Sequence, residues 1–305
     1  MRVTIVHNPE AGSGDHSGAA LIERVRAAGH EVSYASTEAE SLTRALNAEP
    51  DVLIAAGGDG TVAAVARLLA ASGRDVPIAI LPTGTANNIA RSLGVPDSVT
   101  EMVDALATAR RRPLDVWMLR AAWGTTRFVE SAGVGLFAAT LRDAARDEST
   151  GNSADSSARA SGRGKRLRQV LDRARARHWR VEADGEDLSG TYFLAVPLNI
   201  CFVGPTLALA PQADPGDGLL DLLLVGEEHR QALTDYLDGI ARGDERPLTI
   251  PTRRVTRVRL EWSAAHGHVD DRLWPEDGSS GANPSDPMSD IAIAGRPLQV
   301  LVPGG

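Results

Sequence analysis

The sequence predicts a chain of two parts, an α/β domain followed by a β-sandwich domain. In the first part, short apolar segments alternate with longer segments whose apolar residues recur at helical spacing. This alternation is typical of a parallel sheet with helices on both faces. In the second part, most apolar segments are joined by turns, which indicates an antiparallel sandwich or an open barrel. We predict that the two domains cover residues 1–115 and 116–305.

The predicted strands and helices of the first part follow one another closely. The segment 52–56 contains only valine, leucine, isoleucine and alanine, as expected for a strand buried on both faces. Ligands of parallel sheets bind at the carboxyl ends of the strands, so we expect the site in the loops that follow them. The predicted strands are 3–7, 32–35, 52–56 and 78–81, and the predicted helices are 18–28, 40–46, 62–71, 87–93 and 99–110.

The predicted elements of the second part are mainly strands. Two segments, 147–164 and 275–289, are rich in small and polar residues, and we predict disordered or lid-like loops there. The predicted strands are 114–122, 126–129, 179–183, 191–196, 219–225, 255–262 and 298–302.

Composition excludes several classes of protein. The chain has 305 residues, enough for two ordinary domains, and a net charge of −8, which makes nucleic acid a poor partner. Its single cysteine, Cys201, excludes an intrachain disulfide and fits a reducing compartment. No signal-peptide pattern opens the sequence, and no apolar stretch is long enough to span a bilayer. We expect a cytoplasmic protein whose contact with the inner face of a membrane is peripheral.

The turn after the third predicted strand, Gly57-Gly58-Asp59-Gly60-Thr61, has the features of a phosphate site. Its glycines let a ligand approach the backbone, and Thr61 can cap a helix whose N–H groups suit a phosphate. Asp59 has the wrong charge for bare phosphate, unless it reaches Mg²⁺ or a ribose, or orients the loop. The simpler interpretation is a tight connection, because the turn lacks the Walker ending and the dinucleotide-fold spacing.

Two further loops follow predicted strands of the same sheet. The segment 8–14 consists mainly of small residues that leave room for a nucleotide, and the segment 82–88 offers Thr85 and Asn87 at a helix start. Each loop alone is explained by a plain turn or by helix N-capping. Because all three loops lie at one edge of a parallel sheet, together they indicate a nucleotide site.

An acidic turn in the second part is a candidate cation site. Asp214 and Asp217 are three residues apart and precede an apolar strand. Carboxylate and backbone oxygens at such spacing can hold a hard cation. An Asp-rich turn without a ligand is the alternative interpretation.

The ordered set of motifs resembles the diacylglycerol kinase catalytic-domain family, specifically its soluble bacterial lipid kinases. The motifs are the Asn8-Pro9 opening, the turn at 57–61, the segment 82–91, the segment 210–221 and the closing segment 298–303. The resemblance implies a nucleotide-binding α/β domain, similar to that of NAD kinase and phosphofructokinase, joined to a β-sandwich domain. It also implies that ATP lies in the cleft between the domains.

The resemblance further implies the ligands of both cofactors. A structural Mg²⁺ would be held by Asp214, Asp217 and the backbone of Leu219. The residues expected to contact ATP are Asn8, Pro9, Glu10, Ala11, Gly12, Thr37, Gly57, Gly58, Asp59, Gly60, Thr61, Thr85 and Asn87.

Several positions depart from the family's pattern. Ala63 and Ala64 stand where the family usually has Asn and Glu, and Asn88 stands where it usually has Asp.

The most serious departure affects the general base. Arg272 stands at the Glu of the family's Asp-Gly-Glu motif, an acidic pair that includes the proposed base. A guanidinium cannot accept the substrate's proton, so the base would be Asp270, Asp271 or Glu276.

Three functions are compatible with these observations. The first is a lipid kinase that transfers the γ-phosphate of ATP to diacylglycerol or a related lipid, with Asp59 on the metal side and Asp270 as base. The second is a nucleotide- or lipid-binding protein of the same fold with impaired catalysis. The third is an NAD kinase, which shares the Gly-Gly-Asp-Gly turn but should carry a second adenosine signature. The resemblance also permits a homodimer.

The segment 163–180 is strongly basic and has an apolar stripe at helical spacing, formed by Leu167, Val170, Leu171 and Ala174. A basic amphipathic helix can dock on anionic lipid. A helix packed on the sandwich with its charges in solvent is the alternative, and we favour it.

Overall fold

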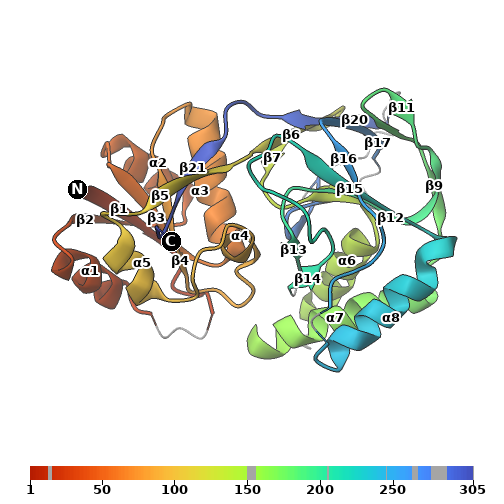
Figure 1. Cartoon of the computed structure of the whole chain (residues 1–305), viewed down its shortest axis with the longest axis horizontal. Coiled ribbons are helices and arrows are strands. Elements are labelled where there is room, and N and C mark those ends of the chain that lie inside the picture. The colour runs from red at the N-terminus through yellow and green to blue at the C-terminus, as the bar shows by residue number, and fades with distance from the viewer. Residues whose placement is uncertain are drawn as a thin grey trace. The chain divides into compact units, whose positions relative to one another are not determined.

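The computed structural model describes residues 1–12, 16–149, 156–204, 206–244, 246–262, 267–275 and 287–304, with the backbone alone at 148–149 and 156–163. The chain divides into two compact units (Figure 1). The first unit comprises Met1–Val116, Pro215–Asp217 and Gly295–Gly305, and the second comprises Trp117–Asp214 and Gly218–Ala294.

The first unit is a mixed sheet with helices on both faces. Contacts place α1 beside α5 and α2 beside α3, as Figure 1 shows. The strands lie in the order β2 (Glu31–Ser36), β1 (Arg2–His7), β3 (Val52–Gly57), β4 (Ile78–Pro82), β21 (Leu298–Val302) and β5 (Arg110–Leu114), all parallel except β5. The helices are α1 (Gly18–Ala27), α2 (Ala39–Asn47), α3 (Asp59–Ser72), α4 (Asn88–Ser92) and α5 (Val99–Ala105).

Local sequence explains most of these elements. Every residue of β3 is buried, which fits its unbroken apolar sequence at the centre of the sheet. The Ser17 side chain accepts a hydrogen bond from Ala20 N and so caps α1. The four strands predicted before residue 82 are therefore confirmed, each within one residue at either end.

Two predicted boundaries differ from the structure. Helix α3 begins at Asp59 with Gly58 as its N-cap, so the predicted capping by Thr61 is wrong, and Thr61 lies inside the first turn. Glycine permits this early start because it has no β-carbon at the sharp strand-to-helix bend. Helix α5 ends at Ala105, earlier than predicted, because residues from Arg110 onward form β5.

The closing strand differs from its predicted grouping. The sequence placed residues 298–302 with the sandwich strands, but β21 pairs in parallel with β4 and antiparallel with β5. Four of its five residues are buried, as an interior strand requires. The segment 215–217 also belongs to the first unit, where Asp115 N donates a hydrogen bond of 2.6 Å to Pro215 O.

The second unit is an antiparallel β-sandwich, as predicted. The two sheets enclose a core that includes Trp117, Phe128, Leu222, Val258 and Trp262. One sheet has the order β11 (Glu186–Asp187), β10 (Val181–Ala183), β17 (Arg257–Glu261), β20 (Met288–Ile293), β6 (Trp117–Ala121) and β7 (Gly124–Phe128). The other has the order β16 (Arg253–Val255), β15 (Leu220–Gly226), β12 (Gly190–Leu198), β8 (Ala132–Gly135), β18 (Gly267–Val269) and β19 (Arg272–Leu273), with β9 (Arg177–Trp179) paired to β12.

Helices accompany the sandwich and were largely missed from the sequence. They are α6 (Leu136–Ser149), α7 (Ser156–Arg173), the 3₁₀ turn η1 (Glu227–His229) and α8 (Arg230–Ala241), while β13 (Phe202–Val203) and β14 (Leu207–Ala208) form a small hairpin. The prediction of a loop over 147–164 is wrong for 147–149 and 156–164, which are helical. Residues 150–155 and 276–286 of the two predicted loops lie outside the described residues.

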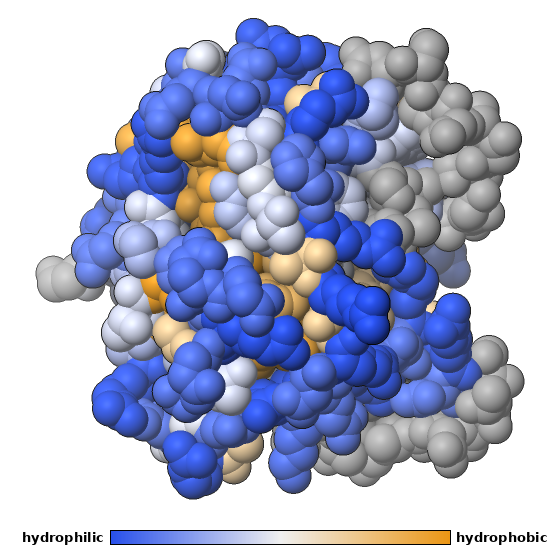
Figure 2. All heavy atoms as spheres, turned by 90° about the vertical axis from the view of Figure 1, so that its right-hand side faces the viewer, coloured by the Kyte–Doolittle hydropathy of each residue, from blue (hydrophilic) through white to orange (hydrophobic). Residues whose placement is uncertain are grey.

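Helix α7 covers most of the predicted basic segment, and its apolar stripe packs into the second unit. Leu167, Val170 and Leu171 are at most 4% exposed, which confirms the packed-helix interpretation for these residues. The surface on the α8 side of this unit is mostly hydrophilic, with apolar side chains visible in recesses (Figure 2). Among the described residues, no helix combines the length and apolar character that crossing a membrane requires.

Candidate functional site

Three loops of the first unit meet at the carboxyl edge of its sheet, and we call them the glycine-loop site (residues 8–12, 57–61 and 82–88). The strand register aligns their starts, since His7 pairs with Ser36 and Ala56, and Gly57 pairs with Pro82. After β1 the chain forms β2 on one side of β1, and it then crosses to the other side of β1 to form β3. Such a reversal of strand order is where open α/β sheets bind ligands.

The first loop is held by its own asparagine and by a close approach to the third loop. Asn8 N donates to Ala56 O (3.1 Å), and Asn8 Oδ1 accepts from Glu10 N (3.1 Å). Gly12 has φ +68°, and a β-carbon there would lie 2.0 Å from Thr83 O. Glycine is therefore required at this position, both for the backbone conformation and for space.

The second and third loops are in similarly close contact. A β-carbon on Gly84 would lie 2.3 Å from Gly58 Cα, so the two backbones touch directly. Asn87, at φ +50°, uses its side chain to close the third loop, accepting from Gly84 N (3.1 Å) and donating to Gly84 O (2.9 Å). The side chain of Asn87 thus shapes the loop, and it does not cap α4.

Asp59 joins the second loop to the third. Its Oδ1 accepts a hydrogen bond from Ile89 N (2.9 Å), in the first turn of α4. Helix α4 therefore receives its capping group from a different loop. Of the roles that the sequence left open for Asp59, the structure shows the one that orients the loops, and its metal-side and catalytic roles stay predictions.

The remaining polar groups of the glycine-loop site differ in exposure. Thr61 Oγ1 and Thr83 Oγ1 are buried and have no hydrogen-bond partner among the described residues. Thr85 is exposed and Thr37, after β2, is half-buried, so both hydroxyls are accessible at the loop edge. Thr83 was not singled out from the sequence, although its place between Pro82 and Gly84 at a strand end was a usable signal.

Asp270 lies in the second unit, at a turn of the sandwich. Asp270 and Asp271 form the two-residue connection between β18 and β19, and Asp270 has φ +50°, a conformation that Asp adopts more readily than most residues. Its Oδ1 accepts hydrogen bonds from Val129 N (3.2 Å) and Glu130 N (2.9 Å), and its own N–H donates to Ser131 O (2.7 Å). Asp270 is 7% exposed, and these backbone hydrogen bonds hold its carboxylate in one orientation.

Asp270 lines a small and largely apolar cavity of about 80 Å³, which we call the Asp270 cavity. His268 lies beside it, with Nε2 3.5 Å from Ser131 Oγ. Burial lowers the pKa of His268 to about 4, although a backbone hydrogen bond with Gly133 opposes the shift, so the ring is neutral at pH 7. The lining residues are Glu130, Ser131, Phe137, Thr140, Leu141, Leu167, Val203, Gly204, Leu207, His268, Asp270 and Asp271.

The structure separates the candidate bases. Asp271 also lines the Asp270 cavity but is exposed, whereas Asp270 is buried. Arg272, at the position of the family acid, is half-buried with Nη2 3.5 Å from Thr126 Oγ1. Glu276 lies outside the described residues. Geometry therefore favours Asp270 over Asp271 as a fixed carboxylate facing an apolar space.

The predicted metal ligands stay a prediction. Asp214 and Leu219 belong to the second unit and Asp217 to the first, and both carboxylates are exposed. Within the described part of the chain, no group of three or more His, Cys, Asp or Glu side chains is arranged to hold a metal ion. The predicted set of metal ligands contains only two acidic side chains, so a search for groups of three or more does not test it.

Comparison with known proteins identifies the family. The sequence profile of the diacylglycerol kinase catalytic domain matches residues 2–119, and that of the YegS C-terminal NAD kinase beta sandwich-like domain matches residues 143–282. Residues 2–119 therefore belong to the diacylglycerol kinase catalytic-domain family, and residues 143–282 belong to the YegS C-terminal domain family. The resemblance and the fold class predicted from the sequence are therefore confirmed.

Individual members of the diacylglycerol kinase family show how far the similarity extends. A diacylglycerol kinase of Bacillus subtilis (strain 168) is 28% identical over 234 residues, 73% of each chain. One of Mycobacterium tuberculosis (strain H37Rv) is 25% identical over 287 residues, 88% of each chain. The crystal structure of a diacylglycerol kinase from Bacillus anthracis str. Sterne, 19% identical, aligns with a TM-score of 0.67 and covers 99% of this chain and 96% of its own. This last likeness establishes a common fold.

Proposed function

We propose that this chain is an ATP-dependent lipid kinase that phosphorylates a hydroxyl group of diacylglycerol or a related lipid. Membership of the family and the diacylglycerol kinase names of its relatives support a kinase. The observation that supports a lipid as the substrate is the Asp270 cavity, where a fixed carboxylate faces apolar side chains. On this proposal the protein meets its substrate peripherally at a membrane surface and serves phospholipid metabolism.

The glycine-loop site fits ATP. The N-terminus of helix α3 lies in the second loop and has no side-chain cap, so the positive end of the helix dipole favours a phosphate there. The neighbouring loops add the buried hydroxyls of Thr61 and Thr83 and the accessible hydroxyls of Thr37 and Thr85. These groups bind and orient the triphosphate, which is the main contribution of a protein to phosphoryl transfer.

A Mg²⁺ ion would be held by the carboxylates of Asp214 and Asp217 and by the backbone oxygen of Leu219, because hard cations prefer carboxylate and carbonyl oxygens. Bound there, Mg²⁺ would neutralise the negative charge of these carboxylates and order the turn that carries them.

Asp270 supplies the base in this proposal. Its carboxylate accepts the proton of the lipid hydroxyl as that oxygen bonds to the γ-phosphorus of ATP. The bond from the γ-phosphorus to the β–γ bridging oxygen breaks at the same time, and ADP leaves. The backbone N–H groups of Val129 and Glu130 fix one carboxylate oxygen. The apolar lining excludes water and accommodates the part of the acyl chains next to the hydroxyl.

The alternative of an impaired binding protein rests on the departures from the family's pattern. Arg272 replaces an acid beside Asp270, and Ala63, 1% exposed, is packed into the first unit where the family has a polar residue. Neither residue can perform acid–base chemistry.

One assay separates the alternatives. Phosphate transfer from ³²P-labelled ATP is measured to a panel of diacylglycerol, other hydroxyl-bearing lipids and NAD⁺, with ATP affinity measured separately by calorimetry. A kinase labels a lipid, an impaired binder retains ATP affinity without labelling any acceptor, and labelling of NAD⁺ alone refutes the lipid assignment.

A further inference from the structure

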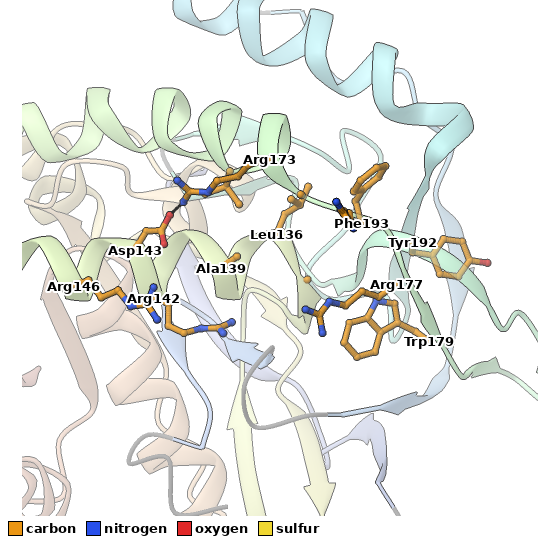
Figure 3. A pocket seen from close by; sticks show the side chains of 14 residues that line it. Leu136, Ala139, Arg142, Asp143, Arg146, Arg173, Arg177, Trp179, Tyr192 and Phe193 are labelled. Carbon is orange, nitrogen blue, oxygen red and sulfur yellow. Dashed lines mark ion pairs between the residues drawn. The ribbon is translucent and has the colours of Figure 1, made fainter.

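A second cavity of the second unit has arginines on much of its wall, and we call it the arginine cavity (Figure 3). It has a volume of about 440 Å³, within the usual range of small-molecule sites. Helices α6 and α7 and strands β9 and β12 contribute its walls. The lining residues are Gly135, Leu136, Ala139, Arg142, Asp143, Arg146, Val170, Arg173, Ala174, Arg175, Arg177, Trp179, Tyr192 and Phe193.

The charges in this cavity are unbalanced. Among the described residues that line it, five are arginines and Asp143 is the one acidic residue. Asp143 is already ion paired with Arg173, as the dashed line in Figure 3 shows. The described lining side chains thus carry a net charge of about +4, from five guanidinium groups and one carboxylate.

Arg142 is the centre of this imbalance. Its Nε and Nη2 atoms are buried and have no hydrogen-bond partner among the described residues. Figure 3 shows Arg142 on α6 and Arg177 on β9 extending toward each other. Burial, followed by the positive charges of Arg146 and Arg177, lowers the pKa of Arg142. Buried N–H groups without an acceptor are costly, and a bound anion that accepted from Nε and Nη2 would remove that cost.

The other wall of the arginine cavity is apolar. Leu136, Val170 and Phe193 line it together with the indole of Trp179, and Leu136, Val170, Trp179 and Phe193 are each at most 5% exposed. Guanidinium groups opposite an apolar wall suit an amphiphilic ligand, whose phosphate meets the arginines and whose carbon atoms contact the wall. A purely inorganic ion would fill only a small part of the volume.

The arginine cavity is distinct from the Asp270 cavity, although both use helix α6. Leu136, Ala139, Arg142 and Arg146 recur at helical spacing and face the arginine cavity. Phe137, Thr140 and Leu141 face the Asp270 cavity from the opposite side of the same helix. A ligand in one cavity is therefore separated from the other by the thickness of α6.

We propose that the arginine cavity binds the phosphate group of an organic phosphate, with Arg142 and Arg177 as its main ligands and the Trp179 wall contacting the organic part. This inference does not rest on the proposed kinase activity. The phosphate belongs either to a soluble phosphate ester or to a phospholipid headgroup, and the experiment distinguishes the two sources.

The test compares the full chain with an Arg142→Gln/Arg177→Gln variant. The matched control is Arg120→Gln, an exposed arginine on β6 that lies outside this cavity. Calorimetry measures binding of inorganic phosphate and of dihexanoyl phosphatidic acid, a soluble phosphate ester. Sedimentation measures binding to vesicles of phosphatidic acid in phosphatidylcholine, beside vesicles of phosphatidylcholine alone.

We expect the affinity for dihexanoyl phosphatidic acid to fall about tenfold or more in the double variant and to change less than about twofold in the control. Loss of vesicle binding in the double variant assigns the phosphate to a lipid headgroup. Loss of soluble binding, with no vesicle binding by any form, assigns it to a soluble ester. A phosphate site elsewhere in the chain still binds the probe in the double variant. The binding that the double variant loses is therefore the binding at the arginine cavity.

Two results overturn the proposal: equal affinity in wild type and the double variant, or no binding of any phosphate probe. Thermal unfolding checks that the variant is folded. If the double variant does not fold, Arg177→Gln alone carries the test, because Arg177 lies on an exposed part of the short strand β9. For that variant we expect a loss of about threefold or more.

Discussion

The glycine-loop site and the Asp270 cavity are built in opposite ways. The glycine loops are mostly backbone, and their shape depends on residues whose side chains are absent, such as Gly12, Gly58 and Gly84. The Asp270 cavity depends on one side chain held by the backbone of residues about 140 positions earlier in the chain. The glycine-loop site should therefore be sensitive to substitutions that add side-chain atoms. The Asp270 cavity should be sensitive to substitutions that change the chemical group of Asp270.

The largest expected effect tests the chemistry of the second site. Asp270→Asn keeps an oxygen that can accept from Val129 N and Glu130 N but removes the base. We expect phosphate transfer to fall by about 10²–10⁴, with ATP affinity unchanged. The control is Asp75→Asn, an exposed carboxylate of the first unit. Full activity of Asp270→Asn together with an inactive Asp271→Asn would move the base to Asp271.

The next effect tests the space in the first site. Gly12→Ala places a β-carbon 2.0 Å from Thr83 O at φ +68°, and we expect a loss of about 2–4 kcal/mol in unfolding free energy and weaker ATP binding. The control is Gly73→Ala, which has the same φ of +68° but open space around the new methyl group. Urea unfolding and calorimetry measure both properties. Equal losses in the two variants would show that backbone strain, and not contact between loops, explains the effect.

A pH effect on stability is expected from His268 at the second site. The pKa of His268 is lowered to about 4 from 6.5, so the folded state holds this ring neutral and binds fewer protons than the unfolded state below pH 6.5. Stability is therefore fully present above pH 6.5 and is lost as the pH falls toward 4, by about 2 kcal/mol between pH 6.5 and pH 5.

Urea unfolding across this pH range measures the contribution of His268. We expect His268→Gln to reduce the slope of stability against pH, whereas His178→Gln, at an exposed position, leaves it unchanged. An unchanged slope in His268→Gln would show that other groups cause the loss.

The smallest effect separates the two roles of Asp59. Asp59→Ala removes the acceptor of the Ile89 N–H, and we expect a loss of about 1 kcal/mol in unfolding free energy. Asp59→Asn retains an acceptor, so its stability should stay close to wild type. If phosphate transfer nevertheless falls in Asp59→Asn, the carboxylate has a metal-side role. If activity and stability change together in both variants, the residue only orients the loops.

The first unit was predictable because its signals are local. Strands β1 to β4 are apolar and short, and each is followed by a loop with an unusual local sequence. The start of α3 was placed too late because the periodic apolar pattern begins after the first turn, whereas the helix begins with Asp59 and Gly60. Pairing of β21 with β4 could not be predicted, since the two are more than two hundred residues apart.

The second unit was less predictable because its features depend on distant partners. The serine- and alanine-rich sequence near residue 147 indicated a loop, but tertiary packing made residues 136–149 a helix with apolar side chains on both cavities. The arginines after residue 163 were visible as a basic segment. Their convergence with Arg142 on a cavity wall was not, because it depends on how α6, α7 and β9 pack.

The sequence by itself determined the family, the α/β and sandwich classes, and the three loops that suggest a nucleotide. These follow from local composition and from the order of motifs along the chain. Only the tertiary structure decided that Asp59 caps α4, that backbone N–H groups hold Asp270, and that Arg142 faces Arg177. The physical reason is that a hydrogen bond, a buried charge or a cavity forms between groups that packing brings together. The number of residues between two groups in the sequence does not determine the distance between them in the structure.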